Sequence, residues 1–172
     1  MLLQALAPIR EANWQLTVAG SLDTDPGYAR SIYKLISRLA LTHKVRLPGV
    51  LQGEELKACL GRSHILAVPS FMEGLALVYL EGMHYGLVPL AAAGGAAGEV
   101  ITPGQDGFLI PAGDVGSLTG ALRELLTDEA RLLAMSLAAR ERMTRHPTWD
   151  QTGAVIRAFV QEFSQRYGRR KK

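Results

Sequence analysis

The feature that most constrains the fold is the alternation of short apolar segments with longer segments of helical periodicity. The expected strands are residues 14–19, 45–47, 65–68, 88–91 and 108–110. The expected helices are residues 2–9, 26–39, 54–62, 77–85, 118–126, 132–143 and 149–167. Strands that alternate with helices form parallel sheets covered by helices on both faces. The sequence therefore predicts an α/β fold with a doubly wound, Rossmann-like parallel sheet.

The expected strands also predict where a ligand would bind. Residues 65–68 are apolar throughout, which is typical of a strand buried on both faces of a parallel sheet. In such sheets, ligands bind outside the carboxyl ends of the strands. Turns follow four of the expected strands, at Gly20, Pro48-Gly49, residues 69–74 and residues 92–98. We expect these turns to lie together along one edge and to form the binding site.

Length and charge limit the possible partners. The 172 residues correspond to about one domain, 1–172, with a basic tail at 168–172. The net charge is +3, but the last four residues are all basic, so the rest of the chain carries −1. A near-neutral body with 6% aromatic residues lacks the basic, aromatic surface of a nucleic-acid binder. The tail is either a solvated end of the chain or a contact with anionic lipid.

Several kinds of site find no support in the sequence. Cys59 is the only cysteine, which excludes an internal disulfide and is typical of a reducing compartment. The histidines have no metal-ligand spacing, and Gly20 opens no G-x-G-x-x-G fingerprint. We therefore expect no metal and no cofactor. No apolar run is long enough to span a membrane, so we expect a cytoplasmic chain, with peripheral membrane contact only through the basic tail.

Two carboxylates mark the candidate site. Glu73 lies in the turn after residues 65–68, and Glu81 lies eight residues later in the following helix. The backbone N–H groups of that turn and the positive end of the helix dipole favour a diphosphate. A helical segment of this length spans about 12 Å, comparable with a sugar, a diphosphate and a ribose. Glu73 could also simply stabilise the helix dipole, by about 0.3–1 kcal/mol.

Glu81 is harder to explain by stability alone. It lies between Leu80 and Met83 on a helix that should pack against the sheet. A buried carboxylate without a partner is costly, so Glu81 is expected to be buried and to need a ligand or a local donor.

Four blocks carry a family resemblance, and they occur in the order 68–74, 80–89, 94–101 and 104–111. With these blocks, residues 2–149 resemble the C-terminal, donor-binding domain of the retaining group 1 glycosyltransferases, which have the GT-B fold. The resemblance implies transfer of a hexose from a nucleoside-diphosphate sugar to an acceptor, without a cofactor. It implies that Glu73, the catalytic candidate, contacts the donor sugar and that Glu81 contacts the ribose. The backbone amides of Gly74, Leu75, Ala76 and Leu77 would hold the sugar and the diphosphate.

The sequence also departs from the family pattern. Ala76 stands where the family usually has glycine, and Gly98 lengthens the spacing to Glu99 by one residue. Family members open this domain with a strand and a loop whose arginine and lysine clamp the diphosphate. The resemblance implies that this strand, this loop and the N-terminal acceptor domain are absent from residues 1–172.

Two consequences follow from such an absence. The first strand of a doubly wound sheet is central, so we expect a gap with unpaired backbone groups. The chain alone is expected to bind donor weakly and to transfer nothing. Two alternatives stay open: a non-catalytic or degenerate nucleotide-sugar-binding or interaction module, and a sugar-nucleotide epimerase on a related two-domain fold.

Overall fold

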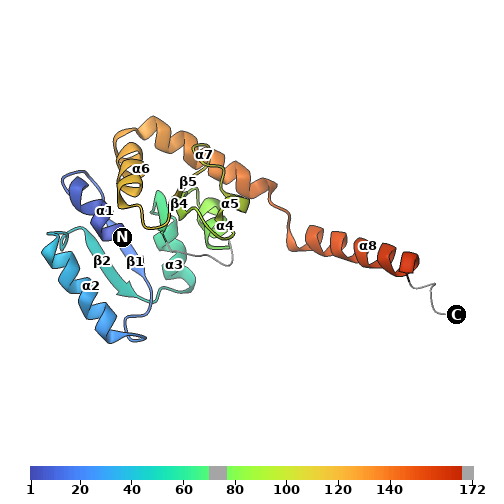
Figure 1. The fold of residues 1–172 in the computed structure, drawn as a ribbon, viewed down its shortest axis with the longest axis horizontal. Helices are drawn as coiled ribbons and strands as arrows, with labels where there is room; N and C mark the ends of the chain where they lie inside the picture. Colours follow the sequence, from blue (N-terminus) through green and yellow to red (C-terminus); the bar gives the residue numbers. More distant parts are fainter. Residues whose placement is uncertain (70–76, 168–172) are drawn as a thin grey trace.

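The computed structural model describes residues 1–69 and 77–167 and shows strands alternating with helices (Figure 1). The strands are β1 (Leu16–Ala19), β2 (Val45–Gly49), β3 (Ile65–Val68), β4 (Val88–Ala92) and β5 (Phe108–Ile110). The helices are α1 (Leu2–Leu6), the 3-10 helix η1 (Ala7–Ile9), α2 (Pro26–Arg38), α3 (Gly53–Leu60), α4 (Leu77–His84), α5 (Ala97–Val100), α6 (Val115–Thr127), α7 (Glu129–Arg145) and α8 (Trp149–Tyr167). The predicted order is confirmed, and α5 is an additional short helix that the sequence did not predict.

All strand pairs are parallel, as predicted, but the described strands form two sheets. One sheet contains β1 and β2, and the other has the order β3-β4-β5. Among the described residues, β1 pairs only with β2 and β3 pairs only with β4. In the strand order of a doubly wound sheet, a central strand would lie between β1 and β3. The gap in the sheet that the sequence predicts would fall between β1 and β3. That a central strand is missing there stays a prediction.

The core lies around β4, which is buried at all five of its residues. Leu90 of β4 belongs to a cluster that includes Leu118 of α6, Met135 of α7 and Leu6 of α1. Helices α1, α6 and α7 therefore contribute to one apolar core with the three-stranded sheet. None of the described helices is both long and apolar enough to cross a bilayer.

Two burial predictions are wrong. Residues Ile65–Val68 of β3 are only partly buried, although the sequence predicts full burial. The reason is that β3 has a described neighbour strand on one side only, whereas β4 has one on each side. Tyr28, expected on the apolar face of α2, is exposed, and Ile36 is the buried residue of that helix.

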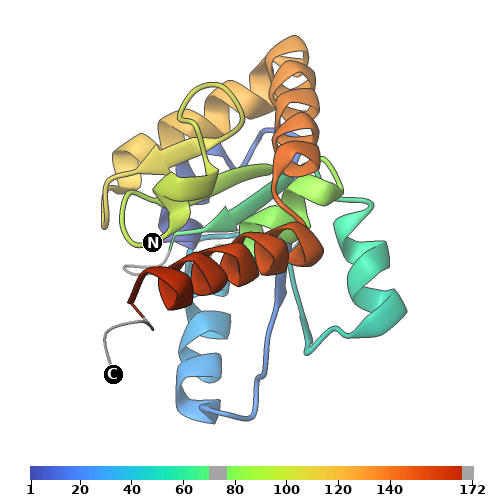
Figure 2. The same ribbon diagram turned by 90° about the vertical axis from the view of Figure 1, so that its right-hand side faces the viewer.

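Helix α8 extends away from the rest of the chain in Figure 1 and lies in front of it in Figure 2. It follows α7 after His146, where the backbone leaves the helical conformation. Pro147 and Thr148 connect the two helices.

Candidate functional site

Within each sheet, the carboxyl ends of neighbouring strands lie at the same edge. That all four turns share one edge stays a prediction. In the smaller sheet, the Gly20 N–H donates to the Gly49 carbonyl oxygen at 2.9 Å. In the larger sheet, Val68 lies opposite Ala91, and Ala92 lies opposite Ile110. The carboxyl ends of neighbouring described strands are therefore held next to each other by the parallel register.

The backbone at the edge of the smaller sheet is open. A Cβ atom placed on Gly20 or Gly49 would meet no heavy atom of the described residues within 4 Å. Gly49 also has a φ of +85°, in the left-handed region that glycine adopts without a steric penalty. The two glycines thus leave free space beside the main chain at the edge where a ligand is expected.

Helix α4 presents Glu81 to solvent. Leu77 is 52% exposed and Glu81 is exposed, whereas Tyr79, Leu80 and Met83 are buried. Leu77 and Glu81 are one helical turn apart on the outward face. The prediction that Glu81 is buried is therefore wrong, because a rotation of 100° per residue carries it away from the face of Leu80 and Met83. Because the Glu81 carboxylate is exposed to water, the folded protein does not need a ligand to compensate for its charge.

Close packing fixes the orientation of α4. A Cβ atom on Gly82 would come within 2.6 Å of Leu66 Cδ2, so the helix lies directly against β3 at this point. Residue 82 faces the strand, and the preceding residue, Glu81, is directed outward. The glycine therefore helps to set the face that α4 presents at the candidate site.

The other predicted site residues lie outside the described part of the chain. These are Glu73, Gly74, Leu75 and Ala76. Their geometry, and the distance from Glu73 to Glu81, stay predictions. Leu77, whose amide is the last of the predicted group, is the first residue of α4.

The block 94–101 contains α5, which is held by α7. Ala97 and Val100 of α5 are buried, and Glu99 is exposed. Arg142 Nη2 donates to the carbonyl oxygen of Glu99 at 2.9 Å. The side chain of Glu99 is thus directed to solvent while its backbone is tied to the body of the protein.

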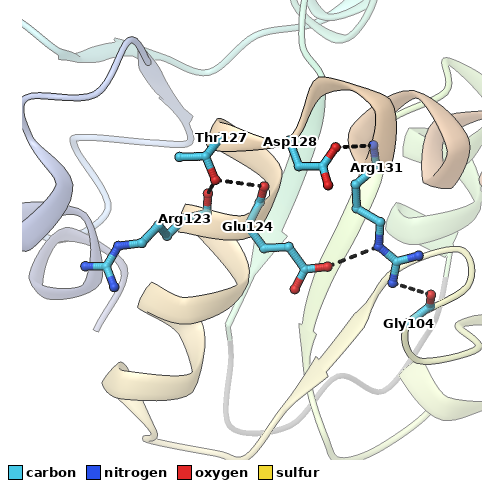
Figure 3. A network of polar contacts seen from close by, with 6 residues as sticks. All are labelled: Gly104, Arg123, Glu124, Thr127, Asp128 and Arg131. Carbon is cyan, nitrogen blue, oxygen red and sulfur yellow. Dashed lines mark hydrogen bonds and ion pairs between the residues drawn. The ribbon is translucent and has the colours of Figure 1, made fainter.

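The block 104–111 has a structural role that the sequence did not reveal. The Thr102 N–H donates to Asp106 Oδ1 at 2.7 Å, and Asp106 is 3% exposed. Arg131 of α7 donates from Nη2 to the Gly104 carbonyl oxygen at 2.7 Å and pairs through Nε with Glu124 of α6 at 3.0 Å (Figure 3). One guanidinium group therefore joins this loop to two helices. No regular spacing connects these residues, so periodicity could not identify them.

The described residues contain no cluster with metal-ligating chemistry. Residues 1–69 and 77–167 hold no group of three or more His, Cys, Asp or Glu side chains that could bind a metal ion. The absence of a metal or cofactor in the functional protein stays a prediction.

The fold and site place the chain in a known class, because a parallel α/β fold with open turns at its carboxyl edge is typical of nucleotide-binding domains. The family model for "Glycosyl transferases group 1" matches residues 1–142. The chain therefore belongs to the group 1 glycosyltransferases.

Individual relatives agree with this assignment. The chain is 28% identical to a GDP-mannose-dependent alpha-(1-6)-phosphatidylinositol monomannoside mannosyltransferase from Mycolicibacterium smegmatis, over 91% of the chain and 42% of that protein. Its structure matches sucrose-phosphate synthase from Thermosynechococcus elongatus with a TM-score of 0.81 and 27% identity, covering 94% of the chain and 42% of that protein.

A third protein, Anabaena HepE in complex with UDP, is 21% identical and has a TM-score of 0.81, covering 93% of the chain and 44% of that protein. This match supports the GT-B fold predicted from the sequence. The chain spans about two fifths of the length of these relatives.

Proposed function

We propose that residues 1–172 form the donor-binding half of a retaining glycosyltransferase that uses a nucleoside-diphosphate sugar. Another domain would hold the acceptor. Two relatives support a nucleoside-diphosphate donor: the structure of HepE contains UDP, and the mannosyltransferase of M. smegmatis is named GDP-mannose-dependent. The base and the sugar of this protein's own donor are left open by the proposal.

The observation that carries this proposal is the position of Glu81 on the outward face of α4, one turn from Leu77. Helix α4 follows the carboxyl end of β3, which is the edge where α/β proteins bind ligands. An exposed carboxylate can accept hydrogen bonds from two neighbouring hydroxyl groups, such as those of a ribose. The N-terminal end of the helix favours the negative charge of a diphosphate.

The remaining roles are assigned on the family pattern. Glu73 orients the donor sugar, and the amides of Gly74, Leu75, Ala76 and Leu77 hold the sugar and the diphosphate. In this reaction, the domain positions the donor and its leaving group for attack by the acceptor. The cytoplasmic location and a membrane contact of the basic tail also belong to the proposal.

The chain by itself is expected to bind donor weakly and to transfer nothing. Negative charge grows on the departing diphosphate, and preorganised cations normally stabilise it. Lys44 does not supply such a cation, because its Nζ donates to the Ala12 carbonyl oxygen at 2.8 Å and lies 5.0 Å from the centre of the Trp14 ring. This lysine has a structural role near the beginning of β1.

Calorimetric titration with UDP, GDP and ADP tests the proposal. One nucleotide should bind, and Glu81→Ala should weaken that binding, whereas Glu11→Gln should not. Glu11 is a suitable control because it is a solvent-exposed carboxylate before β1, paired only at the surface with Arg10. If the folded chain binds none of the three nucleotides, the non-catalytic interaction module becomes the better description.

A further inference from the structure

The outward side of α7 carries four exposed residues, the α7 patch, that the donor site does not explain. The patch consists of Glu129, Leu133, Leu137 and Arg140. Residues three and four positions apart are neighbours on the surface of a helix, so the four lie along one side of α7. Leu133 is 61% exposed and Leu137 is 57% exposed. The patch is therefore apolar in its middle, acidic at its first end and basic at its last end.

Helix α7 lies on the outside of the fold in Figure 1, and its first half is held at the amino ends of the strands. Ser136 Oγ donates to the carbonyl oxygen of Gly86, which precedes β4, at 2.6 Å. Arg131 Nη2 donates to the carbonyl oxygen of Gly104, which precedes β5, at 2.7 Å. The donor is expected at the carboxyl ends of the strands. A partner bound to the α7 patch would therefore leave the candidate donor site open.

A cavity lies directly beside the exposed leucines. It has a volume of about 140 Å³ and is lined by His64, Gly86, Glu129, Leu132, Leu133 and Ser136. A cavity of about 150 Å³ accommodates a benzene ring, so this one has room for an apolar side chain of a partner. The surface thus combines a projecting leucine with a hollow of side-chain size. Such a surface can pack against a second copy of itself.

The charged ends of the α7 patch are available to a partner. Within residues 1–69 and 77–167, neither Glu129 nor Arg140 forms an ion pair. The neighbouring Glu141 differs, because it pairs with Arg145 of the same helix. The patch therefore offers one free carboxylate and one free guanidinium group, at opposite ends of an apolar centre.

An antiparallel second copy complements both ends at once. In this arrangement Leu133 lies across from Leu137 of the second copy, and Glu129 lies across from its Arg140. The midpoint of the two leucines is Met135, and the midpoint of the charged pair falls between Ala134 and Met135. One two-fold axis therefore serves both pairs, and it repeats each contact twice. A partner of a single charge would attract one end of the patch and repel the other.

We infer that the α7 patch is a self-association surface, on which two copies of the chain pair their α7 helices antiparallel. Leu133 and Leu137 form the apolar centre, and Glu129 and Arg140 fix the direction and register. One helix from each copy contributes, so the dimer is at the small end of specific interfaces and forms reversibly. This inference rests on α7 alone. Its failure would leave nucleotide binding at α4 untouched, and failure of nucleotide binding would leave the dimer untouched.

Charge reversal tests the pairing in the 172-residue chain, by sedimentation over a series of micromolar concentrations. The wild type should form a concentration-dependent dimer. Glu129→Arg and Arg140→Glu should each raise the dissociation constant by about tenfold or more, because like charges then face each other at both ends. The double variant should restore the dimer. Arg123→Glu, an exposed reversal on α6, is the control and should have no effect. A wild type that stays monomeric, or a double variant that stays as weak as the single variants, would overturn the inference.

The apolar centre is tested separately from the charges. Leu133→Ser should also weaken the dimer by about tenfold or more, as expected for an interface anchor. Because this leucine is exposed in the monomer, the variant should stay folded, as circular dichroism would verify. Phe159→Ser, on the exposed face of α8, should leave the dimer intact. A dimer that is lost with Phe159→Ser and kept with Leu133→Ser would assign self-association to α8 and refute the proposed interface.

Cysteine cross-linking tests the antiparallel register in a Cys59→Ser background. A disulfide forms only where the two Cα atoms come within about 7 Å. An equal mixture of the Leu133→Cys and Leu137→Cys chains should therefore form mixed disulfide dimers in preference to dimers of either chain with itself. Preferential linkage of each chain with itself would show a parallel pairing and contradict the proposed arrangement.

Discussion

Gly82 of α4 lies against Leu66 of β3 so closely that a Cβ atom on Gly82 would approach Leu66 Cδ2 to 2.6 Å. Gly82 is buried, and Glu81, directly before it, is exposed. The contact therefore connects the packing of α4 on the sheet to the orientation of Glu81, the residue that we propose contacts the ribose. A change in this contact should affect both stability and the position of Glu81.

We expect Gly82→Ala to lower the free energy of unfolding by about 1–3 kcal/mol, measured by urea denaturation, because overpacking displaces the helix or the leucine. Gly120→Ala in α6 is the matched control, since its Cβ atom would meet no atom of the described part of the chain within 4 Å. That control should raise the free energy of unfolding by up to about 1 kcal/mol, the helix preference of alanine over glycine. If Gly82→Ala stabilises the protein as Gly120→Ala does, the close contact is not rigid.

The source of this cost can be isolated with a second substitution. Leu66→Ala removes the atom that the new methyl group would meet. In the Leu66→Ala background, Gly82→Ala should therefore cost about 1 kcal/mol less than in the wild type, a coupling typical of contacting residues. Additive effects would show that the strain lies elsewhere.

Arg131→Ala should lower the free energy of unfolding by about 1–2 kcal/mol, because it removes the ion pair with Glu124 and the hydrogen bond to Gly104. The pair is more than a third exposed, which keeps its contribution at the low end. Arg131→Lys should recover only part of the loss, since an ammonium group cannot reproduce the planar fork that reaches both partners. Full recovery with lysine would mean that charge alone matters at this position.

Asp114 should make stability depend on pH in the acid range. The side-chain and backbone hydrogen bonds from Ser117 lower the pKa of Asp114 below its usual 3.8. Its stabilising effect is therefore complete above the pKa of the unfolded chain and is lost as the pH falls through the folded pKa. The destabilisation caused by Asp114→Asn, measured by thermal unfolding, should be constant near neutrality and should shrink below about pH 4.

Ser117→Ala is the companion variant. It removes the hydroxyl that donates to Asp114 Oδ2 at 2.6 Å, so the pKa of Asp114 should rise toward its ordinary value in an NMR titration. An unchanged pKa would contradict the assigned cause.

Most secondary structure followed from local patterns, because periodicity and turn residues act within a few positions. The predicted bounds of β3, β5 and α8 agree with the structure at both ends. Burial was harder to predict, since it depends on neighbours that are distant in sequence. The apolar run of β3 gave no sign that this strand has a described neighbour on one side only, and the residues around Glu81 suggested a buried face.

The candidate site was predictable only in part. The motif order identified the family, which the family model confirms over residues 1–142. To predict that Glu81 is exposed, one must know how α4 is oriented about its own axis. The contact between Gly82 and Leu66 sets this orientation. The contacts that Arg131 makes with Glu124 and Gly104 involve three separate segments of the chain, so no local pattern could indicate them.

The most direct test of the donor site is a double-mutant cycle between Glu81 and the ribose. The affinity of the nucleotide that binds and of its 2′,3′-dideoxy analogue is measured by calorimetry for the wild type and for Glu81→Ala. If Glu81 accepts hydrogen bonds from the ribose, each single change should weaken binding by about tenfold, or about 1.4 kcal/mol. The two changes together should then weaken it little more than either one. Independent, multiplying losses, or no loss with Glu81→Ala, would contradict the proposed role of Glu81.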